Sequence, residues 1–241
     1  MGKSTASNWS DIFDFLSVPA NTVDTVTVPE GYSWDRLISY GDTLWDEPSK
    51  PDKTPVSNLK LSRSFGDSND GMEIFKFGER EILVVNNEWF NPAEGEKSKR
   101  SEYTIPLEIV NKGRQSVGVS IVEIGRKNGN YVTLKNSMYN RRITANTPMD
   151  LTGPGAGHLL LQTADDRLGL TSLGTWTNCG SGKTPWGTFL SCEEGLPYFF
   201  GTDQEDFKPL PTQKRYGLGN PNNRFQCHRA DERFDLYKHP N

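Results

Sequence analysis

The sequence predicts an all-β fold, either a sandwich or a propeller, and three observations support this. Short apolar runs rich in β-branched residues recur along the chain, as in Glu81–Asn86. Asn128-Gly129 lies between two such runs, and this dipeptide is the strongest local signal for a β-hairpin. The chain also has 23 glycines and 15 prolines, which separate the runs in the way that is typical of many short strands.

The elements fall into three stretches of one domain. Residues 1–60 form a loop-rich lead-in, because prolines interrupt most of it and only Ser10–Leu16 has a helical pattern. Residues 61–200 carry the strands. Residues 201–241 are polar and lose the apolar periodicity, so we predict a polar insertion or a truncated tail there. The expected strands span residues 81–86, 117–124, 131–134, 158–163, 174–177 and 186–191.

Composition excludes some classes of function. The net charge is -4 and the basic residues are scattered, so we expect no nucleic-acid-specific binding. No apolar run reaches the length of about 18 residues that predicts a membrane span. Three cysteines leave one thiol outside any disulfide scheme, which suits a thiolate ligand or a reducing compartment. A buried, inert cysteine is the alternative.

The segment from Asn178 to Glu194 is the most informative about function. Cys179 lies in a glycine turn, and a short apolar run then ends at the adjacent carboxylates of Glu193 and Glu194. A soft thiolate and hard carboxylate oxygens within one strand's reach of each other favour a metal site over a disulfide.

Two other acidic motifs are candidates for the same kind of site. Asn69 and Asp70 lie in a glycine-bounded, oxygen-rich stretch that suits Ca2+, although a surface Asx turn would explain it too. Glu88 follows directly on the apolar run at 81–86. A carboxylate at the end of a buried strand is costly unless it is paired or metal-bound, whereas at a surface end it would simply be solvated.

Three further motifs carry weaker hypotheses. His158 follows a glycine-rich stretch and could bind metal or phosphate, but a hydrogen-bonded structural histidine is the more frequent outcome. Gly182-Lys183-Thr184 lacks the first glycine of a phosphate loop, and Pro185 follows at once, so we reject a P-loop nucleotidase. Arg142 could make a bidentate contact with phosphate, with a structural ion pair as the alternative.

Four motifs in order resemble the PhoX-type alkaline phosphatase family. They begin at Phe65, Leu83, Leu151 and Asn178, and the last runs nearly intact to Glu194. The resemblance covers about residues 20–200. It implies a β-propeller, of which this chain would hold only the first blades, and a metal-dependent enzyme that hydrolyses phosphomonoesters and so releases inorganic phosphate.

The resemblance also implies cofactors and ligands. The family's central site holds iron (Fe3+) together with calcium (Ca2+), and Cys179 matches its iron-binding cysteine. Glu194 matches the glutamate that closes the motif, and we predict both as catalytic metal ligands. Glu88, Asp70, Glu193 and Asn69 are the further predicted metal ligands, and Arg142 is the predicted substrate-binding residue. Cys192 is assigned to packing.

Family members are exported by the twin-arginine route, so the resemblance implies a periplasmic or extracellular protein. We expect a monomer that acts on small-molecule phosphate esters. Family members are also much longer than 241 residues. If the chain is a fragment, the ligands of the later blades are missing, and we expect it to be inactive alone. Two alternatives stay open: a non-catalytic β-propeller binding or scaffold protein, and a phosphodiesterase on the same architecture.

Overall fold

The computed structural model describes residues 15–46, 58–90, 105–219 and 225–239. The chain divides into two compact units, Met1–Leu37 and Ile38–Asn241. The described residues of the first unit contain turns and bends and no helix or strand. The helix expected at Ser10–Leu16 lies mostly outside the described residues. Everything that follows concerns the second unit.

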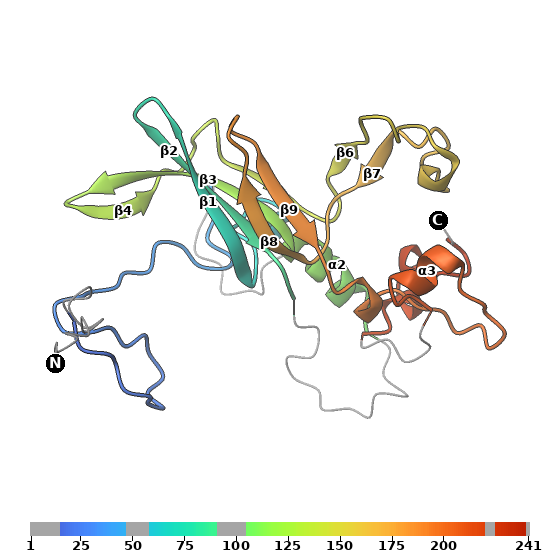
Figure 1. Ribbon diagram of the computed structural model, residues 1–241, viewed down its shortest axis with the longest axis horizontal. Helices are drawn as coiled ribbons and strands as arrows, with labels where there is room; N and C mark the ends of the chain where they lie inside the picture. The colour runs from blue at the N-terminus through green and yellow to red at the C-terminus, as the bar shows by residue number, and fades with distance from the viewer. Residues whose placement is uncertain (1–14, 47–57, 91–104, 220–224, 240–241) are drawn as a thin grey trace, which may run out of the picture. The chain divides into compact units, whose positions relative to one another are not determined.

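A five-stranded antiparallel sheet organises the second unit (Figure 1). Strands β1 (Asn69–Phe77), β2 (Arg80–Asn87), β3 (Gly118–Lys127) and β4 (Asn130–Thr133) are neighbours in that order, and β5 (Arg141–Ile143) also pairs with β3. The described part of the chain is mostly β-sheet with few helices, as the sequence predicted. None of the sheets among these residues closes on itself.

Strand β2 is buried on both faces, as its apolar run predicted. Ile82 and Val84 face a core that includes Phe75 and Ile121 of the neighbouring strands, whereas Leu83 and Val85 are buried on the other face. The hairpin between β3 and β4 also follows the prediction. Its turn residues, Asn128 and Gly129, have φ angles of 54° and 87°, the left-handed pair that this tight turn requires.

Two separate hairpins follow the sheet in the chain. They consist of β6 (Pro148–Asp150) with β7 (Thr171–Leu173), and β8 (Asn178–Lys183) with β9 (Phe189–Glu193). The β8–β9 hairpin lies against β1, and Phe189 joins the apolar core on that face of the sheet (Figure 1). Lys183 donates to the carbonyl of Ile74 at 3.0 Å, so the Gly-Lys-Thr sequence ends a strand and does not form a phosphate loop.

Three of the expected strands are corrected by the structure. Residues 174–177 precede β8 without forming a strand, and residues 186–188 belong to the β8–β9 turn. Residues 159–161 form a short 3-10 helix, η2 (Leu159–Leu161), with His158 Nδ1 accepting from Leu160 N at 3.2 Å. The run of leucines favours a strand in the sequence, but its side chains are exposed and it belongs to no sheet of the described residues.

The helices are few and short. The longest helix among the described residues is α2 (Leu107–Ser116). Besides η2, the described residues also form α1 (Asn58–Leu61), α3 (Pro211–Arg215), η3 (Leu196–Tyr198), η4 (Cys227–Arg229) and η5 (Glu232–Phe234). Glycine is required within α2, because a Cβ on Gly113 would lie 2.3 Å from the ring of Phe90. No described helix has the length and apolar character needed to cross a membrane.

An aromatic core joins α2 to the C-terminal part of the chain. Phe199 is fully buried and its ring lies 4.9 Å from Trp176 and 5.0 Å from Phe225, measured between centroids. Phe225, Cys227 and Phe234 belong to this core. Residues after 200 therefore contribute isolated apolar side chains to the core from an irregular segment. That this stretch is a polar insertion or a truncated tail stays a prediction.

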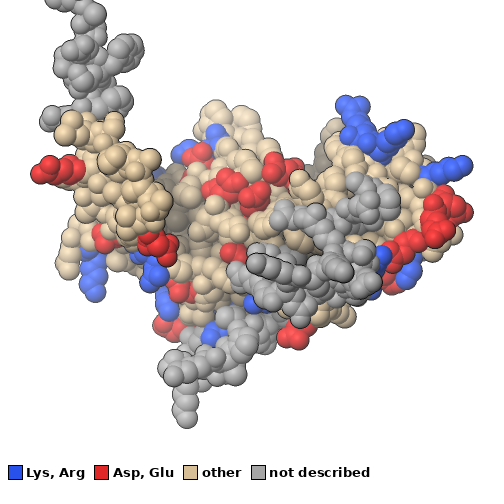
Figure 2. All heavy atoms as spheres, turned by 90° about the horizontal axis from the view of Figure 1, so that it is seen from below, with Lys and Arg blue, Asp and Glu red and all other residues tan. Residues whose placement is uncertain are grey.

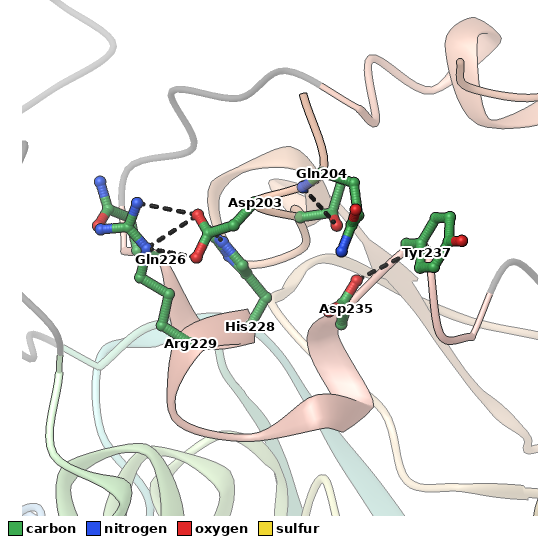
Figure 3. A network of polar contacts seen from close by, with 8 residues as sticks. Asp203, Gln204, Gln226, His228, Arg229, Asp235 and Tyr237 are labelled. Atoms are coloured by element: carbon green, nitrogen blue, oxygen red, sulfur yellow. Dashed lines mark hydrogen bonds and ion pairs between the residues drawn. The ribbon is translucent and has the colours of Figure 1, made fainter. Parts of the chain in front are cut away.

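A polar network orders the same C-terminal segment (Figure 3). Arg229 donates to both carboxylate oxygens of Asp203 at 2.9 Å, and Nε2 of His228 lies 3.1 Å from Oδ1 of Asp203 (Figure 3). These contacts, led by the bond to Arg229, lower the pKa of Asp203. On the molecular face in Figure 2, acidic and basic side chains are interspersed.

We predict that Phe199→Ala destabilises the chain by about 3–5 kcal/mol, because it removes a ring from the centre of the aromatic core and leaves a cavity. Urea denaturation followed by tryptophan fluorescence measures the change. Tyr216→Ala is the matched control, since Tyr216 is 67% exposed. Equal stability of the two variants would contradict the assignment of Phe199 to the core.

Candidate metal centre

Three side chains with metal-binding atoms converge beside the end of β2. Asp70 lies in β1, Glu88 directly follows β2, and Cys179 lies in β8; one ligand atom from each lies within 4.8 Å of the others. The Cys179 thiol donates to Oδ2 of Asp70 at 2.8 Å. We call these residues, with Glu194 described below, the acidic cluster.

Irregularities in two strands aim Asp70 and Cys179 at this point. In β1, Asn69 pairs with Asn87 and Met72 with Val85, so Asp70 and Gly71 together lie opposite Asn86. In β8, Asn178 pairs with Glu193 and Ser181 with Ser191, so Cys179 and Gly180 lie opposite Cys192. Two residues opposite one is the pattern of a β-bulge, which turns a side chain away from the regular alternation.

Glycine permits the two bulged strands to approach closely. A Cβ on Gly71 would lie 2.6 Å from Oγ of Ser181 and 2.7 Å from the carbonyl oxygen of Cys179. Any larger residue would push β1 and β8 apart. The backbone also fixes the third ligand, because Glu88 N donates to the carbonyl of Ser68 at 2.9 Å.

Negative charge accumulates in the acidic cluster. The pKa of Glu88 is raised by partial burial, by the charges of Asp70 and Glu194, and by a hydrogen bond with Glu194. This hydrogen bond places Glu194 next to Glu88, although Glu194 is itself exposed. Among the residues that the structure describes, no lysine or arginine forms an ion pair with any of the three carboxylates. A bound cation would relieve this repulsion.

The cysteine is also held in its neutral form. The pKa of the Cys179 thiol is raised to about 12, chiefly by its hydrogen bond to Asp70 and then by burial and the neighbouring carboxylates. A metal that binds the sulfur must therefore displace its proton, so metal binding tightens as pH rises. A thiolate among carboxylates is a donor set that fits a transition metal beside a harder cation. The donor set by itself leaves the identity of the metals open.

Glu193 and Asn69 do not join the acidic cluster in the structure. Glu193 points to the start of β8, where its Oε1 accepts from Oγ1 of Thr175 at 2.8 Å and from Trp176 N at 2.7 Å. Asn69 accepts from Nδ2 of Asn87 at 3.0 Å, beside the bulge that carries Asp70. Their predicted role as metal ligands stays a prediction, and their present contacts hold backbone and side chains next to the cluster.

Arg142 has a structural environment. Its Nη1 donates to Asn87 and Ser120, and its Nη2 donates to the carbonyls of Gln115, Ser116 and Val117 at the end of α2. It is 8% exposed, and burial lowers its pKa to about 9. Both terminal nitrogens donate to neutral protein acceptors, and no ion pair of Arg142 is present among the described residues. The predicted phosphate contact of Arg142 stays a prediction. A substrate contact would require this network to open.

Two other predictions are resolved by the structure. Cys192 is exposed, so the packing role expected for it is wrong. It lies in β9, opposite the bulge of β8, and the alternation of β9 turns its side chain outward. His158 caps η2 as a structural histidine. Sequence reasoning missed the roles of Gly71 and Asn86. The available signals were a glycine directly after Asp70 and an asparagine within a buried apolar strand.

We predict that Gly71→Ala destabilises the chain by about 1–3 kcal/mol, because its new methyl group would overlap backbone and side-chain atoms of β8. Chemical denaturation measures the loss. Gly182→Ala is the control, since a Cβ at this position of β8 meets no atom within 4 Å. If both variants were as stable as the wild type, the close approach of β1 and β8 would be contradicted.

We predict that Glu88→Gln stabilises the metal-free chain at neutral pH. The raised pKa of Glu88 means that its contribution to stability is present at low pH and is lost as pH rises above the ordinary glutamate value of 4.5 and through the raised folded-state value. The advantage of Glu88→Gln should therefore grow between pH 4 and pH 7.

Thermal melts in the presence of a chelator measure this effect, and each kcal/mol of relieved repulsion raises Tm by about 2–4 °C in a chain of this size. Glu79→Gln, at an exposed glutamate in the β1–β2 turn, should have no such pH-dependent effect. A Glu88→Gln variant that is less stable than the wild type at pH 7 would contradict the charge repulsion.

Two comparisons with known proteins identify the family of this chain. The family model described as "Alkaline phosphatase PhoX" matches residues 13–241. Among solved structures, the chain is similar to Pseudomonas fluorescens PhoX in complex with vanadate, described as a transition-state analogue, with 38% identity and a TM-score of 0.82. The match covers 94% of this chain and 39% of that one, so the chain spans well under half of the solved protein's length.

No curated protein matches the sequence. The family model covers nearly the whole chain, and the solved relative is above 30% identity over almost all of it. The resemblance predicted from the four motifs is thus confirmed. The chain belongs to the PhoX alkaline phosphatase family.

Proposed function

We propose that this chain contributes the thiolate and carboxylate ligands of a metal-dependent alkaline phosphatase that hydrolyses phosphomonoesters and releases inorganic phosphate. The observation that carries the proposal is the convergence of Asp70, Glu88 and Cys179 within 4.8 Å, with Glu194 beside them. Three of these residues are acids without an ion-pair partner among the described residues, so the cluster needs cations to be electrostatically balanced.

We further propose that the cations are Fe3+ and Ca2+. The sulfur of Cys179 is a strongly donating ligand for iron, whereas the oxygens of Asp70, Glu88 and Glu194 suit the harder calcium ion. When bound, such cations would supply positive charge that attracts and orients a phosphoryl group. The chain's own residues hold these cations in place and, through the bulges in β1 and β8, fix the spacing between sulfur and oxygen donors.

The substrates proposed are small-molecule phosphate esters. Family membership supports this class, and the solved relative was captured with vanadate. Preference for monoesters over diesters is part of the proposal. Comparing p-nitrophenyl phosphate with bis(p-nitrophenyl) phosphate separates the two activities, because only a phosphodiesterase turns over the diester efficiently.

The remaining parts of the proposal concern the whole protein. We propose a β-propeller to which the five-stranded sheet and its neighbouring hairpins contribute, a monomeric state, and a periplasmic or extracellular location. The propeller and the location rest on what the family resemblance implies. A disulfide-free set of three thiols in the described structure is compatible with a metal-binding role for Cys179.

We predict that the purified 241-residue chain binds iron together with calcium and that Cys179→Ala loses the iron while retaining most of the calcium. The reason is that the variant removes the sulfur donor and leaves the carboxylates. Elemental analysis measures both metals, and any turnover of p-nitrophenyl phosphate that the chain shows should fall in parallel with the iron content. Cys192→Ala is the control, because Cys192 is exposed and outside the cluster.

Iron binding that survives Cys179→Ala would contradict the assignment of the sulfur ligand. Calcium binding alone, without turnover, would favour the non-catalytic scaffold. Efficient turnover of the diester only would favour the phosphodiesterase.

A further inference from the structure

One buried residue of β2 is a neighbour of both β1 and β8, the other strands that carry ligands of the acidic cluster. Asn86 is fully buried near the end of β2, two residues before Glu88. Residues two apart in a strand share a face, so Asn86 lies on the same face as the apolar Ile82 and Val84. It is therefore a polar side chain at the point where the apolar core meets the acidic cluster.

The carboxamide of Asn86 is hydrogen-bonded to both strands of the β8–β9 hairpin. Its Nδ2 donates to the carbonyl oxygen of Cys179 at 2.7 Å and to that of Gly180 at 3.1 Å. Its Oδ1 accepts from Oγ of Ser191 at 2.9 Å. Cys179 and Gly180 are the two bulged residues of β8, so Asn86 binds the carbonyls at the place where the ladder with β9 is irregular.

Asn86 also lies opposite the other bulge. In the pairing of β1 with β2, it is the single residue that faces Asp70 and Gly71. The same residue thus faces one ligand-bearing bulge through the sheet and holds the other through its side chain. The two bulges that it faces and holds carry the Cys179 sulfur and the Asp70 carboxylate, which are 2.8 Å apart.

We propose that Asn86 is a positioning residue for the metal centre, which holds the Cys179 sulfur at ligand distance from Asp70 and Glu88. This inference rests on the proposed function, because it assigns Asn86 to the same site. Asn86 binds no metal in this proposal; it acts through the backbone of Cys179. Residues that orient ligands in this way change metal affinity by about 10- to 100-fold when they are replaced.

The structure offers a matched control for the loss of a buried asparagine. Asn140 is 6% exposed, and its Nδ2 donates to the carbonyls of Leu44 and Leu134 at 3.0 and 2.8 Å. Its Oδ1 accepts from Glu123 N at 2.8 Å. The side chain of Asn140 therefore makes the same number of hydrogen bonds as that of Asn86, two donated to carbonyls and one accepted, but none of them is to a bulged residue of β1 or β8.

The test uses the full 241-residue chain and Co2+ as a spectroscopic probe of the sulfur ligand. The probe is titrated while the thiolate-to-cobalt charge-transfer absorption is followed. Asn86→Leu should weaken Co2+ binding by about 10- to 100-fold. Asn140→Leu, which loses equivalent hydrogen bonds, should bind within about threefold of the wild type even where its Tm falls.

Asn86→Asp separates positioning from folding and from charge. Aspartate keeps the size of the side chain but cannot donate to the Cys179 and Gly180 carbonyls. Its added negative charge alone would strengthen cation binding. Weaker Co2+ binding in this variant therefore supports the proposal, whereas unchanged or tighter binding by both Asn86 variants overturns it. The proposal is also overturned if Asn140→Leu loses as much Co2+ affinity as Asn86→Leu does.

A metal-free measurement distinguishes this inference from the proposed function. Iodoacetamide labelling, mapped by peptide mass spectrometry, gives the alkylation rate of Cys179 relative to the exposed Cys192 in each variant. Asn86→Leu should raise this ratio several-fold and Asn140→Leu should leave it unchanged. If the wild type bound no Co2+, the proposed function would fail, and an unchanged ratio in Asn86→Leu would then also overturn the positioning of the Cys179 sulfur.

Discussion

The close approach of β8 to β1 is the constraint on which the candidate site depends. It brings a thiol and carboxylates from three separate stretches of chain to one edge, with the Cys179 sulfur 2.8 Å from Asp70. At an effective dielectric constant of about 20, two unit charges about 4.8 Å apart repel by about 3 kcal/mol, and solvent reduces this at a half-exposed edge. The arrangement is unfavourable without cations, and the surrounding structure must maintain it.

The residues on one face of β2 show how the structure holds these like charges together. Along one face the residues change from apolar Ile82 and Val84, through the buried amide of Asn86, to the carboxylate of Glu88. The apolar part packs against Phe189 of β9 and so docks the hairpin. The amide then fixes the hairpin's position by hydrogen bonds with defined geometry, and only the last residue meets the charged cluster. Hydrophobic docking supplies the affinity between strand and hairpin, whereas the buried amide supplies the register.

Local signals were enough to predict β2 and the β3–β4 turn, because apolar β-branched runs and Asn-Gly need no distant partner. The helix α2 and strand β1 escaped notice. Gly113 lowers the helical signal of α2 and is explained only by the distant ring of Phe90. In β1, the turn-forming residues around Asp70 belong to a bulge, whose pairing with β2 no local pattern reveals.

The same distinction applies to the site. Cys179, Asp70, Glu88 and Glu194 were predicted from motif chemistry and are brought together by the fold. Glu193 separates from Glu194 because its carboxylate caps Trp176 N, a contact made by tertiary structure. Arg142 likewise looked like a phosphate ligand, but the end of α2 takes up its guanidinium. Chemical type was readable from the sequence, whereas the direction of each side chain depended on partners far along the chain.

The hydrogen bonds of Arg142 affect how a phosphate ester could bind. A phosphate monoester carries close to two negative charges at neutral pH. The acidic cluster would repel such a substrate. The guanidinium of Arg142 already donates hydrogen bonds to backbone carbonyls. Cations held by the cluster would supply the attraction that such a substrate needs. Metal loading would then precede substrate binding, and the positions of Asp70, Glu88 and Cys179 would govern substrate affinity only through the cations that they hold.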